Sequence, residues 1–403
     1  MPTSAVPLDV LYVGMLPPHP GGSAISWAQI LAGLAGQGHA VRALAPITAH
    51  ELRAGDAFAL ARPELEVHRY VVPHHYTGPN VPASPAYRAS EAEQIESRAA
   101  LLVGQRRPDV VISGRETFAL HVPALARRHR LPCLQGIRGN TAIALIDGSY
   151  PPGLAVEMLA RLRDADVLVA VARHLADGLA QLGVPGIRVI RNAVDLDVFA
   201  PRPAHPALRR ELGIDRDAIT VLHASNLKAA KRPLDLVHAA ELALRREPRL
   251  LFVVVGEGAL RADMEALAEA RGIRGRFRFA GWIDYARMPD VLALADLVVS
   301  TSRSEGMSRI YLEAQAIGCA LVASDIPAAR ELIRDGETGL LFPMGDVEAL
   351  ADRILEAAAS PERRRLLGAR ARARLTDHTF ARTVAEYAQL LHACRRGVSD
   401  AAS

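Results

Sequence analysis

The sequence STSRSEGMSRIYLEA, residues 300–314, decides how the second half of this chain is interpreted. It follows an apolar run, Ala295 to Val299, which predicts a buried parallel strand that ends in small polar residues. A Glu-Gly turn comes next, and the following helix carries Glu313, eight residues after Glu305. Eight residues span a little over two helical turns, so the two side chains can share a face. Because Glu305 lies in the turn, we expect it nearer to the end of the strand.

The backbone amides at the start of this helix belong to Gly306, Met307, Ser308 and Arg309. A helix N-terminus favours an anion, because its N–H groups and dipole point outward. Carboxylates that accept sugar or ribose hydroxyls, beside amides that hold phosphate, predict a sugar-nucleotide pocket. From this segment alone, a solvated surface helix with two ordinary glutamates is an equal alternative.

Length and composition indicate a globular protein with two domains. The chain has 403 residues, 50% of them hydrophobic and 23% charged. No apolar run approaches the length of about 18 residues that a membrane-spanning helix needs. The cysteines Cys133, Cys319 and Cys394 are odd in number and lack metal-ligand spacing. With no signal-like N-terminus, we expect a reducing cytoplasmic location.

The positive charges suggest only weak partner preferences. The net charge is +4, and the densest basic stretch, residues 363–374, falls on a predicted helix. A solvated helix face is favoured there over contact with anionic lipid, so a peripheral membrane contact stays open. Aromatic residues make up 4% of the chain and do not interleave with basic ones. Nucleic acid is therefore not expected as a partner.

Lysine is almost absent from this chain, yet its two lysines lie close together. Lys228 and Lys231 are the only lysines among 48 basic residues. A compact ammonium binds phosphate as a point charge, whereas arginine presents a broad fork. The pair therefore predicts a phosphate pocket, with chance clustering as the alternative.

Apolar runs alternate with amphipathic stretches throughout, which is typical of parallel α/β sheets. The pattern restarts after the Pro-rich stretch Asp197 to Pro206, the predicted linker. We expect two Rossmann-like, doubly wound domains facing a cleft, with ligands at the carboxyl ends of the strands. The predicted boundaries are 1–200 for the N-terminal acceptor-side domain and 201–378 for the donor-side domain. Residues 379–403 are expected to form a helix that packs back on the N-terminal domain.

Two glycine-rich turns follow predicted strands. Gly21 and Gly22 lie in the first turn, and Gly256 opens another in the second half. Such turns let backbone amides approach a diphosphate, although a plain strand-to-helix turn is equally consistent. Neither turn has the G-x-G-x-x-G pattern, which argues against a nicotinamide or flavin cofactor. Residues Arg69 to Ala89 are expected to be irregular and to face an acceptor.

These landmarks, in this order, resemble the retaining glycosyltransferases of the GT-B fold, family 4, which carry an E-x7-E signature. The resemblance runs from about residue 9 to residue 392. Five segments carry it: Pro20-Gly21-Gly22; Asp164 to Val171 with Asn192-Ala193-Val194-Asp195; Lys231; Val253 to Gly258 with Gly281-Trp282-Ile283; and Glu305 to Glu313 with Ala316 to Ser324.

The resemblance implies a role for each predicted donor residue. Lys231, helped by Lys228, Asn226 and the amides of Gly22 and of residues 307–309, would hold the diphosphate. Glu313 would hold the ribose, Glu305 the donor sugar, and the main chain of Trp282 and Ile283 the base. The donor would be a UDP- or GDP-linked hexose or N-acetylhexosamine. No metal and no cofactor is expected, because fixed positive groups would stabilise the leaving diphosphate.

The chain also departs from the family pattern. Ser225 and Asn226 stand where an arginine is frequent, in a form that resembles the glucosaminyl-malate synthases. Arg138 stands where many members have a histidine. Arginine cannot act as a general base at neutral pH, so Arg138 is expected to bind an anionic group. With Glu305 and Lys231, it completes the predicted catalytic residues.

Three functions stay open at this point. A glycosyltransferase with an unknown acceptor leads, and a sugar-nucleotide epimerase of the same fold is the second. The third is a degenerate transferase that serves as a scaffold in a glycan-assembly complex. The donor base, the acceptor and the oligomeric state have no decodable pattern in the sequence.

Overall fold

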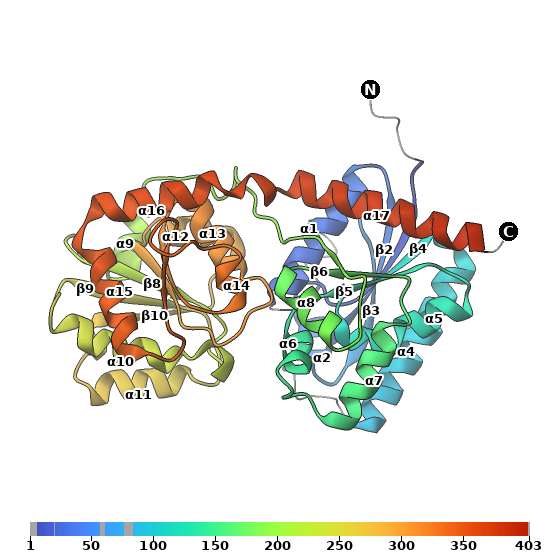
Figure 1. Cartoon of the computed structure of the whole chain (residues 1–403), viewed down its shortest axis with the longest axis horizontal. Helices are drawn as coiled ribbons and strands as arrows, with labels where there is room; N and C mark the ends of the chain where they lie inside the picture. Colours follow the sequence, from blue (N-terminus) through green and yellow to red (C-terminus); the bar gives the residue numbers. More distant parts are fainter. Residues whose placement is uncertain (1–5, 20, 57–60, 76–83, 402–403) are drawn as a thin grey trace. The chain divides into compact units, whose positions relative to one another are not determined.

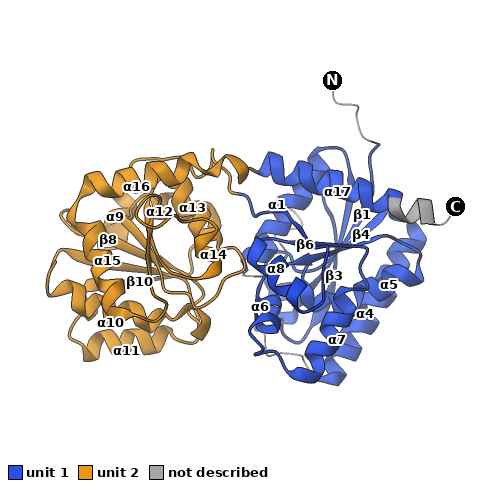
Figure 2. Ribbon diagram, in the orientation of Figure 1, with its two compact units in different colours: residues 1–193, 380–403 blue, residues 194–379 orange. Residues whose placement is uncertain are grey.

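The computed structural model describes residues 6–19, 21–56, 61–75 and 84–401. The chain forms two compact units, residues 1–193 with 380–403 and residues 194–379 (Figure 2). Each unit holds one parallel β-sheet whose strands alternate with helices along the chain (Figure 1). The predicted fold class, two Rossmann-like domains, is confirmed.

Unit 1 has a seven-stranded sheet in the order β3-β2-β1-β4-β5-β6-β7. The chain first builds outward from β1 to β3 and then crosses to β4 on the other side of β1, so the strand order reverses there. The strands are β1 (Asp9–Val13), β2 (Ala40–Thr48), β3 (Glu66–Val72), β4 (Val110–Ser113), β5 (Cys133–Ile137), β6 (Val167–Ala170) and β7 (Arg188–Val189). The helices are α1 (Gly22–Gly36), α2 (Ala49–Ala54), α4 (Pro85–Gln105), η1 (Glu116–Leu120), α5 (Val122–Arg128), α6 (Asn140–Ile146), α7 (Pro152–Leu162), α8 (Arg173–Gln181) and α17 (Phe380–Ala401).

Unit 2 has a six-stranded sheet in the order β10-β9-β8-β11-β12-β13, with a matching reversal between β8 and β11. The strands are β8 (Ile219–Ala224), β9 (Leu250–Val255), β10 (Phe277–Gly281), β11 (Leu297–Ser300), β12 (Ala320–Ser324) and β13 (Leu340–Phe342). The helices are α9 (Pro206–Glu211), η2 (Ala229–Lys231), α10 (Pro233–Leu244), α11 (Arg261–Ala270), η3 (Arg274–Arg276), η4 (Tyr285–Arg287), α12 (Met288–Leu292), α13 (Arg309–Ile317), α14 (Pro327–Arg330), α15 (Val347–Ala359), α16 (Pro361–Ala373) and η5 (Leu375–Asp377). Among the described helices, none is long and apolar enough to cross a membrane.

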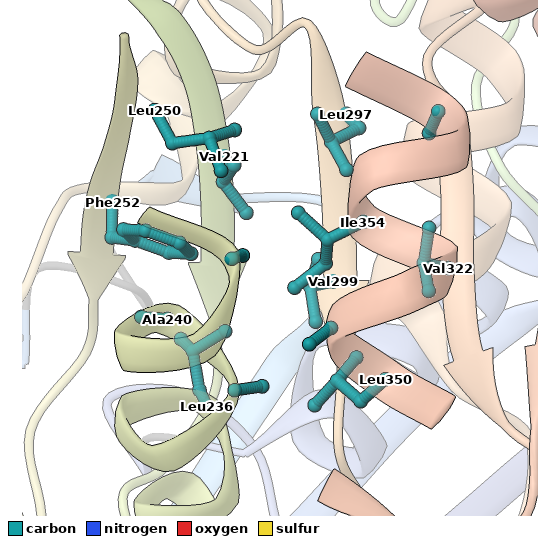
Figure 3. Close-up of a cluster of buried hydrophobic side chains, with 14 of the residues drawn as sticks. Val221, Leu236, Ala240, Leu250, Phe252, Leu297, Val299, Val322, Leu350 and Ile354 are labelled. Carbon is teal, nitrogen blue, oxygen red and sulfur yellow. The ribbon is translucent and has the colours of Figure 1, made fainter. Parts of the chain in front are cut away.

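The core of unit 2 explains why the sequences of its central strands are continuous apolar runs. Side chains of β8, β9, β11 and β12 pack against α10 and α15 (Figure 3). Phe252, Leu236 and Ile354 are fully buried in this cluster. Burying each such side chain contributes about 1.5–3 kcal/mol. The sheet is thereby held as a rigid platform, and the loops at its carboxyl ends take their positions from it.

The boundaries between the units differ from the predicted ones. They fall at 193/194 and 379/380, instead of 200/201 and 378/379, so the predicted linker lies inside unit 2. Phe199 is buried and its ring lies 5.8 Å from that of Tyr285, while Arg202 pairs with Asp290 at 3.0 Å. This Pro-rich segment is anchored by side chains, which its composition did not reveal.

The segment from Arg69 to Ala89 was predicted as irregular, and this was wrong at both ends. Residues 69–72 finish β3, and Pro85 begins α4 behind the N-cap Ser84. β3 is an edge strand in which the polar residues Glu66, His68 and Arg69 are exposed or half-buried, so it lacks the apolar run of a central strand. Residues 76–83 of the predicted acceptor loop lie outside the described residues.

The C-terminal helix α17 packs within unit 1 against α1. The Tyr387 ring on α17 lies 5.3 Å from the Trp27 ring on α1. At Gly33 the two helices approach so closely that an added Cβ would lie 2.4 Å from Cγ2 of Val384. A β-branched side chain cannot move aside easily, so only glycine fits at this crossing.

We expect Gly33→Ala to lower the free energy of unfolding by about 1–3 kcal/mol, because the new methyl group overpacks the α1–α17 contact. Denaturant unfolding of the full chain measures this. The double variant Gly33→Ala/Val384→Ala should recover part of the loss. Gly36→Ala is the matched control on the same helix. Nothing lies within 4 Å of its Cβ position, so this substitution should raise the free energy of unfolding by about 0.5–1 kcal/mol. Equal effects at both glycines would contradict the contact.

Candidate functional site

The candidate site of unit 2 lies where the strand order reverses. β8 pairs with β9 on one side and with β11 on the other, all in parallel. The loops that follow β8 and β11 therefore leave the same edge of the sheet and diverge, which creates a crevice in open α/β sheets. The loop after β8 carries both lysines, and the loop after β11 carries Glu305.

The structure brings Lys231 and Glu305 into direct contact. Nζ of Lys231 lies 2.5 Å from Oε1 of Glu305, and both side chains are largely buried. The hydroxyl of Ser302 donates to the same carboxylate oxygen at 2.8 Å. The Thr301 hydroxyl donates to the Lys231 carbonyl at 2.7 Å, which ties the two loops together. One cation and one carboxylate are thus held at the strand ends, each accessible in part.

The backbone around Lys231 is constrained on its far side as well. The Arg303 amide donates to the Ala230 carbonyl at 2.8 Å. Arg232 adopts a left-handed conformation, with φ at 44°, and its guanidinium bonds to Asp235 at 2.6 Å. A left-handed non-glycine residue costs about 1–2 kcal/mol. The surrounding contacts impose that conformation and so fix where Lys231 points.

Gly256 and Gly258 allow the loop after β9 to lie against the loop after β8. An added Cβ at Gly256 would lie 2.0 Å from the Ser225 carbonyl oxygen, and one at Gly258 would lie 2.4 Å from that of Leu227. Gly256 also has φ at 117°, and its amide donates to the Gly281 carbonyl at 2.8 Å. The Gly-rich turn therefore serves close backbone packing, which braces the lysine loop.

Glu313 is buried on α13 and is held by two side chains. The Tyr285 hydroxyl donates to Oε1 of Glu313 at 3.0 Å, and Nη2 of Arg309 donates to the same oxygen at 3.1 Å. Arg309 also donates to the Tyr285 hydroxyl oxygen, with its Cζ 5.0 Å from the centre of the ring. Tyr285 was missed from the sequence. Its position three residues after Trp282, in the predicted base-binding loop, was the only signal.

The remaining predicted donor residues of unit 2 lie at the start of α13 and in the loops after β8 and β10. Gly306, Met307 and Ser308 are buried, and α13 begins at Arg309. Ser308 is the N-cap residue, and its own side chain makes no capping hydrogen bond. Trp282 is 58% exposed. The predicted residues Asn226, Lys228 and Ile283 lie in the loops after β8 and β10, Lys228 exposed and the other two half-buried.

Gly21, Gly22 and Arg138 belong to unit 1, and all other predicted site residues belong to unit 2. Gly21 is the N-cap of α1 and Gly22 its first residue. The Arg138 guanidinium donates to Oδ1 of Asn192 at 2.8 Å and lies 5.4 Å from the centre of the Trp27 ring. The ion pairs Lys231–Glu305 and Arg309–Glu313 join predicted site residues within unit 2.

Glu116 organises the Arg138 segment. Its buried carboxylate accepts from the amides of Arg138 at 3.1 Å, Gly139 at 2.9 Å and Ala142 at 3.3 Å. The Glu116 side chain is thus committed to the start of α6, where a carboxylate is favoured.

His223 lies beneath the Lys231–Glu305 pair, at the end of β8. Its Nδ1 lies 3.0 Å from the Val299 carbonyl oxygen, and its Nε2 lies 2.8 Å from the Ser225 hydroxyl. Burial, together with the nearby Lys231 charge, lowers the pKa of His223 to about 4. The imidazole is therefore neutral near pH 7 and joins the strands β8 and β11 by a hydrogen bond.

We expect His223 to make stability fall in acid. Its pKa is lower in the folded chain than its ordinary 6.5, so below pH 6.5 the unfolded chain binds the proton more readily. At pH 5 the free energy of unfolding should be about 2 kcal/mol smaller than at pH 8 from this residue alone. Denaturant unfolding of wild type and His223→Gln across pH 5–8 measures the difference.

The free energy of unfolding of His223→Gln should depend less steeply on pH than that of the wild type. Some pH dependence should remain, because burial also lowers the pKa of His121 to about 4. His50→Gln, at an exposed position on α2, is the matched control and should retain the wild-type profile. An unchanged profile in His223→Gln would contradict the assignment.

Comparison with known proteins agrees with this geometry. Residues 205–374 match the family model for glycosyl transferases group 1. Residues 20–198 match the model for glycosyltransferase family 4. Between them the two models span most of both units.

The chain is also similar to curated glycosyltransferases. It is 33% identical over 244 residues to a D-inositol 3-phosphate glycosyltransferase of Xylanimonas cellulosilytica, covering 58% of each chain. It is 29% identical over 214 residues to N-acetyl-alpha-D-glucosaminyl L-malate synthase of Bacillus anthracis, covering 52% of this chain and 55% of that one. The chain spans about half the length of the curated relatives it matches.

A similar fold is found in the crystal structure of Anabaena HepE in complex with UDP-glucose. The TM-score is 0.75 at 19% sequence identity, with 96% of this chain and 100% of that chain covered. Such low identity shows the fold alone. Together, the two matched models and the two parallel-sheet units show that the chain belongs to the family 4 glycosyltransferases of the GT-B fold.

Proposed function

We propose that this chain is a retaining glycosyltransferase that moves a sugar from a nucleotide-diphosphate sugar to an acceptor hydroxyl. The observation that carries the proposal is the Lys231–Glu305 ion pair, held 2.5 Å apart at the strand reversal of unit 2. An ion pair at that position places a cation for a diphosphate beside a carboxylate for sugar hydroxyls.

Each charged group has a distinct part in donor binding. The Lys231 ammonium neutralises the diphosphate, and the amides at the start of α13 add donors for its oxygens. Glu305 then exchanges its ammonium partner for hydroxyls of the sugar. Glu313 accepts from the ribose, and the main chain at Trp282 and Ile283 meets the base. In the donor-free chain, Lys231 and Glu305 keep each other's charge compensated.

Transfer breaks the bond between the anomeric carbon and the diphosphate oxygen. The acceptor oxygen forms its bond on the same face, so the configuration is retained, and its proton passes to the departing diphosphate. Negative charge grows on the leaving oxygen, and fixed positive groups stabilise that charge best when they need no reorganisation. We propose Lys231 and the α13 amides as these groups, without a metal ion.

For the substrates we propose a UDP- or GDP-linked hexose or N-acetylhexosamine and an acceptor with an anionic group. The structural relative in complex with UDP-glucose makes UDP the first nucleotide to test. The two named relatives act with D-inositol 3-phosphate and L-malate, both of which are anionic. Arg138, held by Asn192, supplies unit 1 with a guanidinium that could bind such a group.

We expect Lys231→Ala and Glu313→Ala each to weaken nucleotide binding by about 10- to 100-fold, because each removes a hydrogen bond to or from a charged group. Isothermal titration calorimetry with UDP and GDP measures the affinity. Incubation with the matching sugar nucleotide and candidate acceptors, followed by NMR of the product, tests transfer and retention of configuration.

Glu348→Ala is the matched control, because Glu348 is an exposed glutamate in the first turn of α15. It should bind nucleotide as the wild type does, and thermal unfolding should show that all variants fold. Unchanged affinity in both site variants would overturn the proposed site. An isomerised sugar nucleotide formed without acceptor would instead indicate an epimerase.

A further inference from the structure

Tyr285 lies between two segments of the proposed donor site. It begins η4, immediately after the loop that holds Trp282 and Ile283. Its hydroxyl reaches Glu313 on α13, which is 28 residues later in the chain. One side chain therefore connects the segment expected at the nucleotide base with the carboxylate expected at the ribose.

The direction of the hydrogen bonds around Tyr285 follows from chemistry. A guanidinium has only donors, so Arg309 donates to the Tyr285 oxygen. The phenolic proton is then available to Glu313, whose Oε1 lies 3.0 Å away. Burial raises the pKa of the Tyr285 phenol, and the Glu313 charge raises it further. The phenol therefore keeps its proton and remains a donor at any physiological pH.

The position of Tyr285 is fixed from several sides. The Asp284 side chain accepts from the Ala286 amide at 2.9 Å, which sets the start of the 3₁₀ turn. The buried ring of Phe199 lies 5.8 Å from the Tyr285 ring at an angle of 49°. The Arg309 guanidinium covers the ring at 5.0 Å. These contacts hold the ring so that its hydroxyl points to Glu313.

Both donors converge on a single oxygen of Glu313. Tyr285 and Arg309 each donate to Oε1, and the Glu313 side chain is only 6% exposed. A carboxylate anchored by one oxygen cannot rotate about its side-chain torsion. Its Oε2 is then presented in one fixed direction, as selective recognition of a hydroxyl requires.

We propose that Tyr285 is a positioning residue, supported by Arg309, that orients Glu313 so that the site distinguishes a ribonucleotide from a 2′-deoxyribonucleotide. This inference rests on the proposed function, because it deepens the role of Glu313 there. Tyr285 touches Glu313 and acts on the nucleotide through it. A site that is built around a hydroxyl rejects an analogue that lacks it, because its own acceptor is left unpaired.

The test compares affinities of the full chain for two nucleotides. The probes are UDP or GDP, whichever binds the wild type more tightly, and its 2′-deoxy counterpart. The wild type should prefer the ribonucleotide, and Glu313→Gln should abolish the preference. Tyr285→Phe should reduce the preference about three- to tenfold, mainly through weaker ribonucleotide binding. Calorimetric titrations of all three proteins measure these ratios.

Tyr70→Phe is the matched control. The Tyr70 hydroxyl also donates to a buried glutamate, Glu91 at 3.3 Å, but in unit 1. It should leave the preference unchanged.

Two results overturn the inference. One is a Tyr285→Phe variant that keeps the wild-type preference while Glu313→Gln loses it. The other is a Tyr285→Phe variant whose affinity for both nucleotides falls by the same factor, which would indicate a structural role. If neither UDP nor GDP binds the wild type, the proposed function itself fails and the inference fails with it.

Discussion

The reversal of strand order at β8 determines where the loops of the candidate site in unit 2 lie. Because β9 and β11 both pair with β8 in parallel, three strands release their loops at one edge of the sheet. A core of fully buried aliphatic and aromatic side chains holds those strands rigidly. Residues that lie 74 positions apart, Lys231 and Glu305, can then meet at 2.5 Å. Their charges would not be held in place by either loop alone.

Close backbone packing converts that topology into a defined site. Gly256 and Gly258 let one loop lie directly on the carbonyl groups of the lysine loop, where any Cβ would collide. Thr301 and Arg303 bind the same loop from the opposite side. The left-handed conformation of Arg232 is sustained by these contacts. These contacts preorganise the candidate site, as the proposed stabilisation of a developing charge requires.

Two buried glutamates show how the same side chain serves different ends. Glu116 accepts from three backbone amides and so stabilises the start of α6 in unit 1. Glu313 receives side-chain donors on one oxygen, which defines its geometry, and the proposed role of its other oxygen is recognition of a hydroxyl. A carboxylate committed to backbone amides has a structural role. A carboxylate oriented by other side chains is suited to binding.

The fold class and a central strand could be predicted from the sequence alone. The strand predicted from the apolar run Ala295 to Val299 corresponds to β11, Leu297–Ser300, because central strands are apolar on both faces. Three features became visible only in the folded chain: the edge strand β3, the unit boundary at 193/194 and the hydrogen bond from Tyr285 to Glu313. Apolar runs and charged residues are local signals. Other features depend on neighbours that are far away in the chain. These are the position of a strand at the edge of a sheet, the packing of the Pro-rich segment and the direction of the Tyr285 hydroxyl.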